Sequence, residues 1–436
     1  MLRLKLREAL EAAVPARTAR DLRLPAVPGK AFAVIGVRRG GKTSFLQRRI
    51  AERLAAGEPA GTHLLLTLED ERLVGMTAAD LGWLLDEHRR LVHSVRDRGR
   101  RTIYLDEVQV VPGWELVVRR HLDAADTELF VSGSSARLLS AEVHTSLRGR
   151  SMEVLVHPFS FREVLRHAGE EPVCSWFDLA ANERAELDAR LRSFLKVGGF
   201  PEAQGLEALD RVGLLRGYVD LMVLRDVVER HRASNIEALR RLQRHLLANP
   251  GGPFSVSRFH RDLKGQGLAV GEETLHNYLA HLEDAFLVRT VSMHTASERQ
   301  RMRNPRKVYP IDQGIIPVYE RGGRENHGRS LETVVLLELE RRGYKAGWVR
   351  VGEDREVDFF AEHPTHEPLL MQVALDTAME ATWEREVRSL SAAAEAYPDA
   401  RPYLVTLDPT PPSRPLPGRL EWRAAADWLL DTAHRS

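Results

Sequence analysis

The sequence contains a single cysteine, Cys174, in 436 residues. One cysteine excludes an internal disulfide and any metal site that is built from several cysteines. Long apolar runs are also missing: AFAVIGV at 31–37 is far shorter than the roughly 18 residues that a membrane span requires. The first residues, MLRLKLREAL, lack the apolar segment of a signal peptide. We therefore expect a cytoplasmic protein with no membrane partner.

The chain has almost no net charge, because 63 basic residues face 62 acidic ones. A net charge of +1 creates no global field that would attract nucleic acid. Lysine is rare, so nearly all basic residues are arginines, and a lysine inside a motif is more informative here than an arginine cluster. The lysines occupy positions 5, 30, 42, 196, 264, 307 and 345. The length indicates roughly two to four globular domains.

A phosphate-binding motif lies near the start of the chain. Residues 31–46, AFAVIGVRRGGKTSFL, predict a strand, a glycine-rich turn and a helix, and they fit G-x-x-x-x-G-K-[ST]. The glycines let backbone N–H groups surround phosphate oxygens, and the helix directs its positive end at them. Lys42 would reach the β- and γ-phosphates of ATP, and the Thr43 hydroxyl would hold Mg²⁺. The expected nucleotide-binding residues are Gly36, Val37, Arg38, Arg39, Gly40, Gly41, Lys42, Thr43 and Ser44.

Two further strands support an ATPase. Residues 102–109, TIYLDEVQ, place Asp106 and Glu107 at the end of an apolar run. There, Asp106 can hold Mg²⁺ and Glu107 can polarise the attacking water. Residues 129–139, LFVSGSSARLL, end in hydroxyl residues that could bind the γ-phosphate or its water, with Ser134 preferred over Ser132. The alternative is that these serines cap the next helix.

Together with LRGRSMEVLVHPFSFREVL at 147–165 and KVGGFPEA at 196–203, these motifs resemble the AAA-type predicted ATPases. The resemblance covers nearly the whole chain. It implies an AAA-like P-loop core, a helical lid and a C-terminal domain of unknown function. It also makes Arg150 a candidate arginine finger, which would reach a neighbouring copy and hence require self-association. Arg148 and Arg225 compete for this role, and a surface or lid arginine is the alternative.

The predicted secondary structure of the middle of the chain changes after about residue 248. Residues 158–248 predict helices, whereas 249–312 predict helix, helix and two strands, the order of a winged helix. The loop ERQRMRNPRK would be the tip of the wing and would contact DNA phosphates. Its basic residues are Arg299, Arg301, Arg303, Arg306 and Lys307. Against this, Glu272 and Glu273 start the longer helix and would repel phosphates, and a solvated loop remains the alternative.

The last part, 313–436, predicts helix, three strands, helix and strand, an order that resembles PD-(D/E)xK nucleases. Glu332 on the helix and Asp358, two residues after Glu356 on a strand, match the metal-binding acids of that fold. Gln372 replaces the second acid, and Ala374 replaces the lysine. Lys345 could in principle supply the missing charge. We expect a fold that is retained for binding or structure, without nuclease activity.

The sequence thus predicts an α/β protein with a P-loop AAA-type ATPase core at 1–157 and a helical lid at 158–248. A winged helix at 249–312 and a restriction-endonuclease-like α/β domain at 313–436 follow. The expected function is Mg²⁺-dependent ATP hydrolysis coupled to DNA engagement by the C-terminal half. The alternatives are a nucleotide-controlled switch that binds a protein partner, and an ATP-fuelled nuclease.

Overall fold

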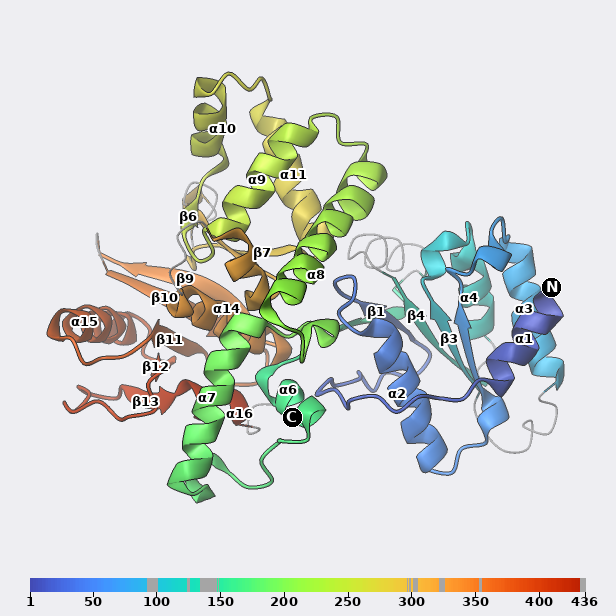
Figure 1. The fold of residues 1–436 in the computed structure, drawn as a ribbon, viewed down its shortest axis with the longest axis horizontal. Helices are drawn as coiled ribbons and strands as arrows, with labels where there is room; N and C mark the ends of the chain where they lie inside the picture. Colours follow the sequence, from blue (N-terminus) through green and yellow to red (C-terminus); the bar gives the residue numbers. More distant parts are fainter. Residues whose placement is uncertain are drawn as a thin grey trace. The chain divides into compact units, whose positions relative to one another are not determined.

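A computed structural model of the chain describes residues 1–91, 101–123, 126–133, 147, 149–295, 297, 299–300, 305–320, 326–352 and 355–431. The chain divides into two compact units (Figure 1). Unit 1 comprises Met1–His157 with Asp284–Phe286, and unit 2 comprises Pro158–Glu283 with Leu287–Ser436. Within the described ranges, no helix combines the length and the apolar character of a membrane span.

Unit 1 is built on a five-stranded sheet in which all paired strands run parallel, in the order β2-β3-β4-β1-β5. Every residue of β1 and β3 is buried, as expected for a parallel sheet whose two faces are covered by helices. The strands are β1 (Ala31–Ile35), β2 (His63–Thr67), β3 (Arg101–Asp106), β4 (Thr127–Ser132) and β5 (Ser151–Leu155). The helices are α1 (Leu2–Glu11), α2 (Lys42–Ala55), α3 (Ala78–Leu91) and α4 (Trp114–Leu122).

The strand order decides which segments meet at the edge of this sheet. Strand β4 pairs with both β1 and β3, so the ends of these three strands lie side by side. Ligands of open α/β sheets bind at the carboxyl ends of the strands. The loop after β1, the acids after β3 and the serine at the end of β4 therefore come together.

The first part of unit 2 is helical, and polar side chains cap several of its helices. Ser160 and Glu163 form a capping box at the start of α6, and Asn235 and Ser255 cap α9 and α10. The helices are α6 (Phe161–Ala168), α7 (Ala181–Val197), α8 (Ala208–Leu221), which continues as the π-helix η8 (Met222–Glu229), and α9 (Ile236–Ala248).

Two further helices and a small antiparallel sheet with the strand order β6-β8-β7 follow α9 in the chain. These are α10 (Val256–Gly265), α11 (Glu272–Asp284), β6 (Pro253–Phe254), β7 (Val288–Val291) and β8 (Arg306–Pro310). A short helix, α13 (Ile316–Tyr319), leads into the last part of the unit.

The last part of unit 2 is a five-stranded sheet in the order β13-β12-β11-β10-β9. Its strands are β9 (Lys345–Val351), β10 (Arg355–Glu362), β11 (Leu369–Ala374), β12 (Arg401–Thr406) and β13 (Glu421–Ala424). The helices are α14 (His327–Arg341), α15 (Glu380–Ala396) and α16 (Ala425–Leu430). The predicted order of helix, three strands, helix and strand is present, and β13 and α16 extend it.

Helices α14 and α15 cover opposite faces of this sheet. Phe359 of β10 packs in the same core cluster as Leu331 of α14, whereas the next residue, Phe360, packs with Leu390 of α15. The register of β10 against β9 shifts by one residue between Val357 and Phe360. Such a bulge re-aims side chains locally, and Asp358 lies within it.

Candidate functional site

The P-loop, residues 36–44, connects β1 to α2 and has a backbone that requires glycine. Gly36 and Gly41 have φ angles of 144° and 100°, which favour glycine. A Cβ atom on Gly36 would lie 2.2 Å from the carbonyl oxygen of Val156. No side chain caps α2, so no side-chain acceptor competes with an anion at this helix N-terminus.

Lys42 is the first residue of α2, and its side chain is buried at the loop. Its ammonium donates hydrogen bonds to the carbonyl oxygens of Gly36 and Val37, at 3.0 and 3.1 Å. Buried cations need such partners. The positive charge is therefore held at the loop. The other predicted nucleotide-binding residues, Val37, Arg38, Arg39, Gly40 and Ser44, lie in the same loop and first helical turn.

Asp106 at the end of β3 connects the P-loop to the neighbouring strand ends. The Thr43 hydroxyl donates to Asp106 Oδ2 at 2.7 Å, and the Ser132 hydroxyl donates to Asp106 Oδ1. Burial raises the pKa of Asp106, while the hydrogen bonds from Ser132 and Thr43 oppose this shift. Carboxylate and hydroxyl oxygens are the donors that Mg²⁺ prefers, so Thr43 and Asp106 fit the predicted metal site.

Glu107 follows Asp106 with a left-handed backbone, φ 55°. Its backbone N–H donates to the Ser132 hydroxyl at 3.1 Å, and the Gln109 side chain donates to its carboxylate. Ser132 thus contacts both Asp106 and Glu107. The preferred serine, Ser134, lies outside the described residues, so the structure places the alternative, Ser132, in this cluster.

Arg20 is a member of the site region that the sequence reasoning missed. Its guanidinium donates to the carbonyl oxygen of Gly40 at 3.3 Å and to that of His157. These two hydrogen bonds therefore hold the N-terminal segment against the P-loop and the end of unit 1. In a chain with so many arginines, no spacing distinguishes Arg20 from the others.

Comparisons with known proteins agree with this geometry. Residues 28–165 match a family model described as an AAA domain, and residues 188–321 match a domain of unknown function (DUF8612). The uncharacterized protein MJ1544 of Methanocaldococcus jannaschii is 31% identical over 379 residues, which cover 86% of this chain and 81% of that protein. The chain belongs to the MJ1544 family. Its unit 1 is a P-loop AAA-type ATPase domain, as predicted.

More distant relatives of this MJ1544-family protein include an uncharacterized protein of Haemophilus influenzae. That protein is 27% identical over 351 residues, which cover 79% of this chain and 82% of the relative. Among solved structures, the Walker-type ATPase of Pyrococcus abyssi matches 73% of this chain and 94% of its own, with 17% identity and a TM-score of 0.41. The ORC1 protein of Aeropyrum pernix, solved in complex with DNA, matches 73% and 91%, with 17% identity and a TM-score of 0.26.

The predicted arginine finger, Arg150, lies away from the P-loop of its own chain. It precedes β5, whose first residue pairs with Ala31 at the start of β1, whereas the P-loop follows the end of β1. The length of a five-residue strand, about 16 Å, separates the two edges of the sheet. Arg150 is exposed and forms an ion pair with Asp123. Of the competitors, Arg225 pairs with Glu229 on η8, and Arg148 lies outside the described residues.

The predicted basic wing tip lies only partly within the described residues. Arg299 and Arg306 are exposed, and Arg301 and Arg303 lie outside the described residues. The prediction for Lys307 is wrong: its side chain is 5% exposed and forms ion pairs with Glu356 and Asp358. Lys307 lies on β8 and is directed into the protein, where a DNA backbone cannot reach it.

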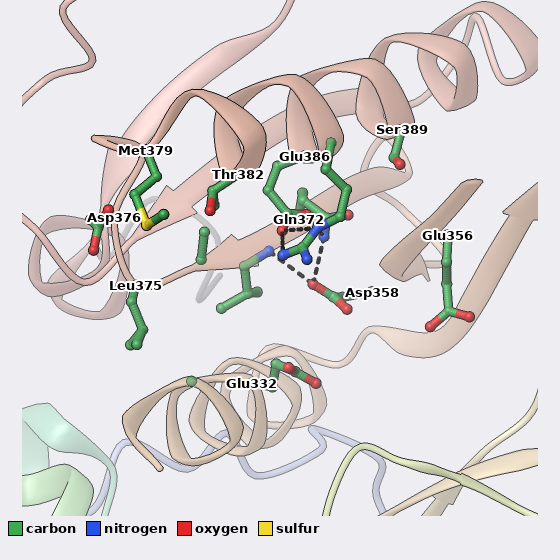
Figure 2. A pocket seen from close by; sticks show the side chains of 14 residues that line it. Glu332, Glu356, Asp358, Gln372, Leu375, Asp376, Met379, Thr382, Glu386 and Ser389 are labelled. Carbon is green, nitrogen blue, oxygen red and sulfur yellow. Dashed lines mark hydrogen bonds and ion pairs between the residues drawn. The ribbon is translucent and has the colours of Figure 1, made fainter. Parts of the chain in front are cut away.

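Acids in the last part of unit 2 line a cavity of about 490 Å³ (Figure 2). Glu332 projects from α14 and Asp358 from β10, while Gln372 reaches in from β11. Burial, together with the Asp358 charge, raises the pKa of Glu332 to about 8. Lys345, the lysine that could have supplied the missing charge, is exposed on β9. Its register partner is Glu362, at the opposite end of β10 from Glu356, so it does not reach this cavity.

Proposed function

We propose that this MJ1544-family protein is a Mg²⁺-dependent ATPase that converts ATP and water to ADP and phosphate. The contact between Thr43 and Asp106 carries the proposal. It joins the start of α2, where the phosphates of ATP would bind, to the strand end that bears Glu107. This adjacency of the proposed metal ligands, the phosphate-binding loop and the candidate base supports the proposal.

Each side chain has a role that follows from its place. Bound Mg²⁺ would supply charge neutralisation at the phosphates, with Thr43 and Asp106 as its protein ligands. The ammonium of Lys42 binds phosphate oxygens. Glu107 orients a water molecule and accepts its proton, while the water oxygen bonds to the γ-phosphorus and the bond to the ADP oxygen breaks. The Ser132 hydroxyl contacts both Asp106 and Glu107 and fixes their positions relative to each other.

The metal requirement gives the test of this proposal. Purified protein should release phosphate from ATP with Mg²⁺ and should stop when EDTA removes the metal. Asp106→Asn should lower turnover by about 100-fold or more, since it removes a charged metal ligand. The exposed Asp399→Asn on unit 2 is the matched control and should keep the wild-type rate. Turnover in EDTA, or a normal rate in Asp106→Asn, would contradict the proposal.

Arg150 would act on the nucleotide of a neighbouring copy. Its exposure and its distance from the P-loop of its own chain support this role and the self-association that it requires. Arg150→Ala should lower turnover by about 10-fold or more, and wild-type turnover per chain should rise with protein concentration. A concentration-independent wild-type rate, together with normal turnover in Arg150→Ala, would contradict it.

The C-terminal half of the protein would engage DNA. We assign residues 158–248 to a helical lid, 249–312 to a winged helix and 313–436 to a nuclease-like domain. Support for a winged helix comes from the order of β6, α10, α11, β7 and β8. Arg299 and Arg306 at the ends of the loop between β7 and β8 are exposed and could contact phosphates.

The DNA assignment is tested by ATPase rates and by binding at low salt. Duplex, single-stranded and branched DNA should bind, and at least one should raise the rate of ATP hydrolysis. Arg299→Ala combined with Arg306→Ala should weaken binding several-fold and reduce its salt dependence. Arg388→Ala, an exposed arginine on α15, should change neither. If none of the DNAs binds at low salt, the DNA half of the proposal fails.

A protein partner is the alternative for the same half. The start of α11 favours it, because Glu272 and Glu273 give the first turn of this helix a negative charge that would repel DNA phosphates. A nucleotide-dependent complex with a defined protein, together with absent DNA binding, would select this alternative.

A further inference from the structure

The segment between α1 and β1, residues 12–30, is described throughout and contains no helix or strand, yet it is anchored to unit 1 on both sides of Arg20. Val14 and Leu24 are partly buried and pack against the core cluster that contains Phe45 of α2. Burial of apolar side chains before and after Arg20 restricts the backbone between them. Arg20 is therefore presented to the P-loop by an anchored segment.

The P-loop lies against the backbone that follows β5. Val156 is the first residue after β5, and its N–H donates to the carbonyl oxygen of Ile35 at 2.8 Å, which ties it to the end of β1. The carbonyl oxygen of Val156 lies 2.2 Å from the position of a Cβ atom on Gly36 and 3.5 Å from that of a Cβ atom on Gly40. The start and the later part of the loop are therefore both close to one backbone segment that the sheet holds in place.

Arg20 connects this backbone segment to Gly40. Its Nη1 donates to the carbonyl oxygen of Gly40 at 3.3 Å, and its Nη2 donates to the carbonyl oxygen of His157. Gly40 is buried, and a buried carbonyl group needs a hydrogen-bond partner. A guanidinium carries N–H groups on separate nitrogens and can serve two acceptors that lie apart, whereas an ammonium has all of its N–H groups on one nitrogen. Arg20 thus fixes Gly40 relative to the end of the sheet.

The direction of the Gly40 carbonyl decides where the next N–H group points. The peptide that joins Gly40 to Gly41 is planar and trans, so its C=O and its N–H point in opposite directions. Because the carbonyl is turned toward Arg20, the Gly41 N–H faces away from Arg20. Gly41 is the N-cap residue of α2 and has a φ angle of 100°. Backbone N–H groups at this place in a P-loop are those that bind phosphate oxygens.

We propose that Arg20 is a positioning residue of the phosphate site, which holds the Gly40–Gly41 peptide in the orientation that binds ATP and acts through that peptide. The inference rests on the proposed ATP binding by unit 1 and adds a residue outside the P-loop motif. The loop contacts the phosphates in the ground state and in the transition state alike. Loss of Arg20 should therefore weaken ATP binding and raise KM, with only a small effect on kcat.

Equilibrium binding of Mg²⁺-ATP tests this role in the full-length Glu107→Gln protein, in which hydrolysis does not interfere. Adding Arg20→Ala should weaken binding by 10-fold or more. Adding Arg17→Ala is the matched control and should leave binding unchanged, because Arg17 lies in the same segment but donates to Gln47 of α2 at 2.8 Å. A parent protein that binds no ATP would contradict the proposed function and this inference with it. A parent that binds ATP equally well with and without Arg20 would overturn this inference alone.

Turnover in the otherwise wild-type protein separates positioning from a purely structural role. Arg20→Ala should raise the KM for ATP by 10-fold or more and lower kcat by less than about 3-fold. A structural defect would instead lower Tm and the fraction of active protein, and hence kcat, at an unchanged KM. Arg20→Lys is the second variant, which also serves if Arg20→Ala does not fold: it keeps the charge, but its single nitrogen cannot replace both contacts, so KM should still rise several-fold. An unchanged KM in either folded variant would overturn the proposal.

Discussion

At the scale of single residues, each of the two buried lysines lies among polar or charged partners. Lys42 and Lys307 are buried, whereas the remaining lysines are at least partly exposed. A compact ammonium on a flexible stem can enter a narrow, charged space more readily than a planar guanidinium. Lys42 donates to two carbonyl oxygens, and Lys307 contacts two carboxylates. In this arginine-rich chain, it is therefore the buried lysines that indicate clusters of polar or charged groups.

Ser132 gives a prediction at this scale. Ser132→Ala removes a donor to Asp106 and the acceptor of the Glu107 N–H. The free energy of unfolding should fall by about 1–2 kcal/mol, since a buried backbone donor loses its partner. Turnover of ATP should fall as well, because Asp106 and Glu107 lose their common support. Urea unfolding and phosphate release measure the two effects, and an unchanged rate in a folded variant would contradict this role for Ser132.

At the scale of elements, local motifs indicated the contacts of the P-loop in unit 1 well, and the contacts of Asp358 in unit 2 poorly. The P-loop motif is contiguous, and parallel strands place their carboxyl ends at one edge, so the sequence indicated that Thr43 and Asp106 would meet. The partner of Asp358 was not predictable in this way. Lys307 reaches it from another sheet, and the bulge that aims Asp358 leaves no mark in the alternation of apolar residues. Helix and strand positions follow from periodicity, but contacts between distant elements do not.

The P-loop gives the prediction that belongs to an element. Gly36→Ala should abolish ATP binding and cost about 2 kcal/mol or more in stability, because its Cβ would overlap the Val156 carbonyl oxygen. Gly57→Ala is the matched control, since Gly57 also has a positive φ, 89°, but has open space around its Cβ position. That variant should lose about 1 kcal/mol and bind ATP normally. Nucleotide binding and thermal unfolding compare the two, and equal behaviour would contradict the steric account.

At the scale of the whole molecule, unit 1 should be more sensitive to acid than its composition suggests. Burial lowers the pKa of His88 and of His121 to about 4 each. Both imidazoles are therefore neutral in the folded unit, while the unfolded chain protonates them near pH 6.5. The unfolded state binds more protons between these values, so stability is full above pH 6.5 and falls as the pH drops toward 4.

The expected loss between pH 7 and pH 5 is about 2 kcal/mol for each histidine. Urea unfolding of the full chain at the two pH values measures it. Replacing His88 by Gln removes one titrating group and should reduce the pH dependence by about half, whatever its effect on absolute stability. An equal pH dependence in wild type and variant would show that His88 does not control acid sensitivity.

The central claim is that unit 1 hydrolyses ATP with Lys42 as phosphate ligand and Glu107 as base. The most direct measurement pairs nucleotide binding with phosphate release in two variants. Lys42→Ala should lose binding, whereas Glu107→Gln should bind Mg²⁺-ATP with near-normal affinity and release phosphate at least 100-fold more slowly than wild type. Wild-type turnover in Glu107→Gln, or normal binding and turnover in Lys42→Ala, would contradict the account.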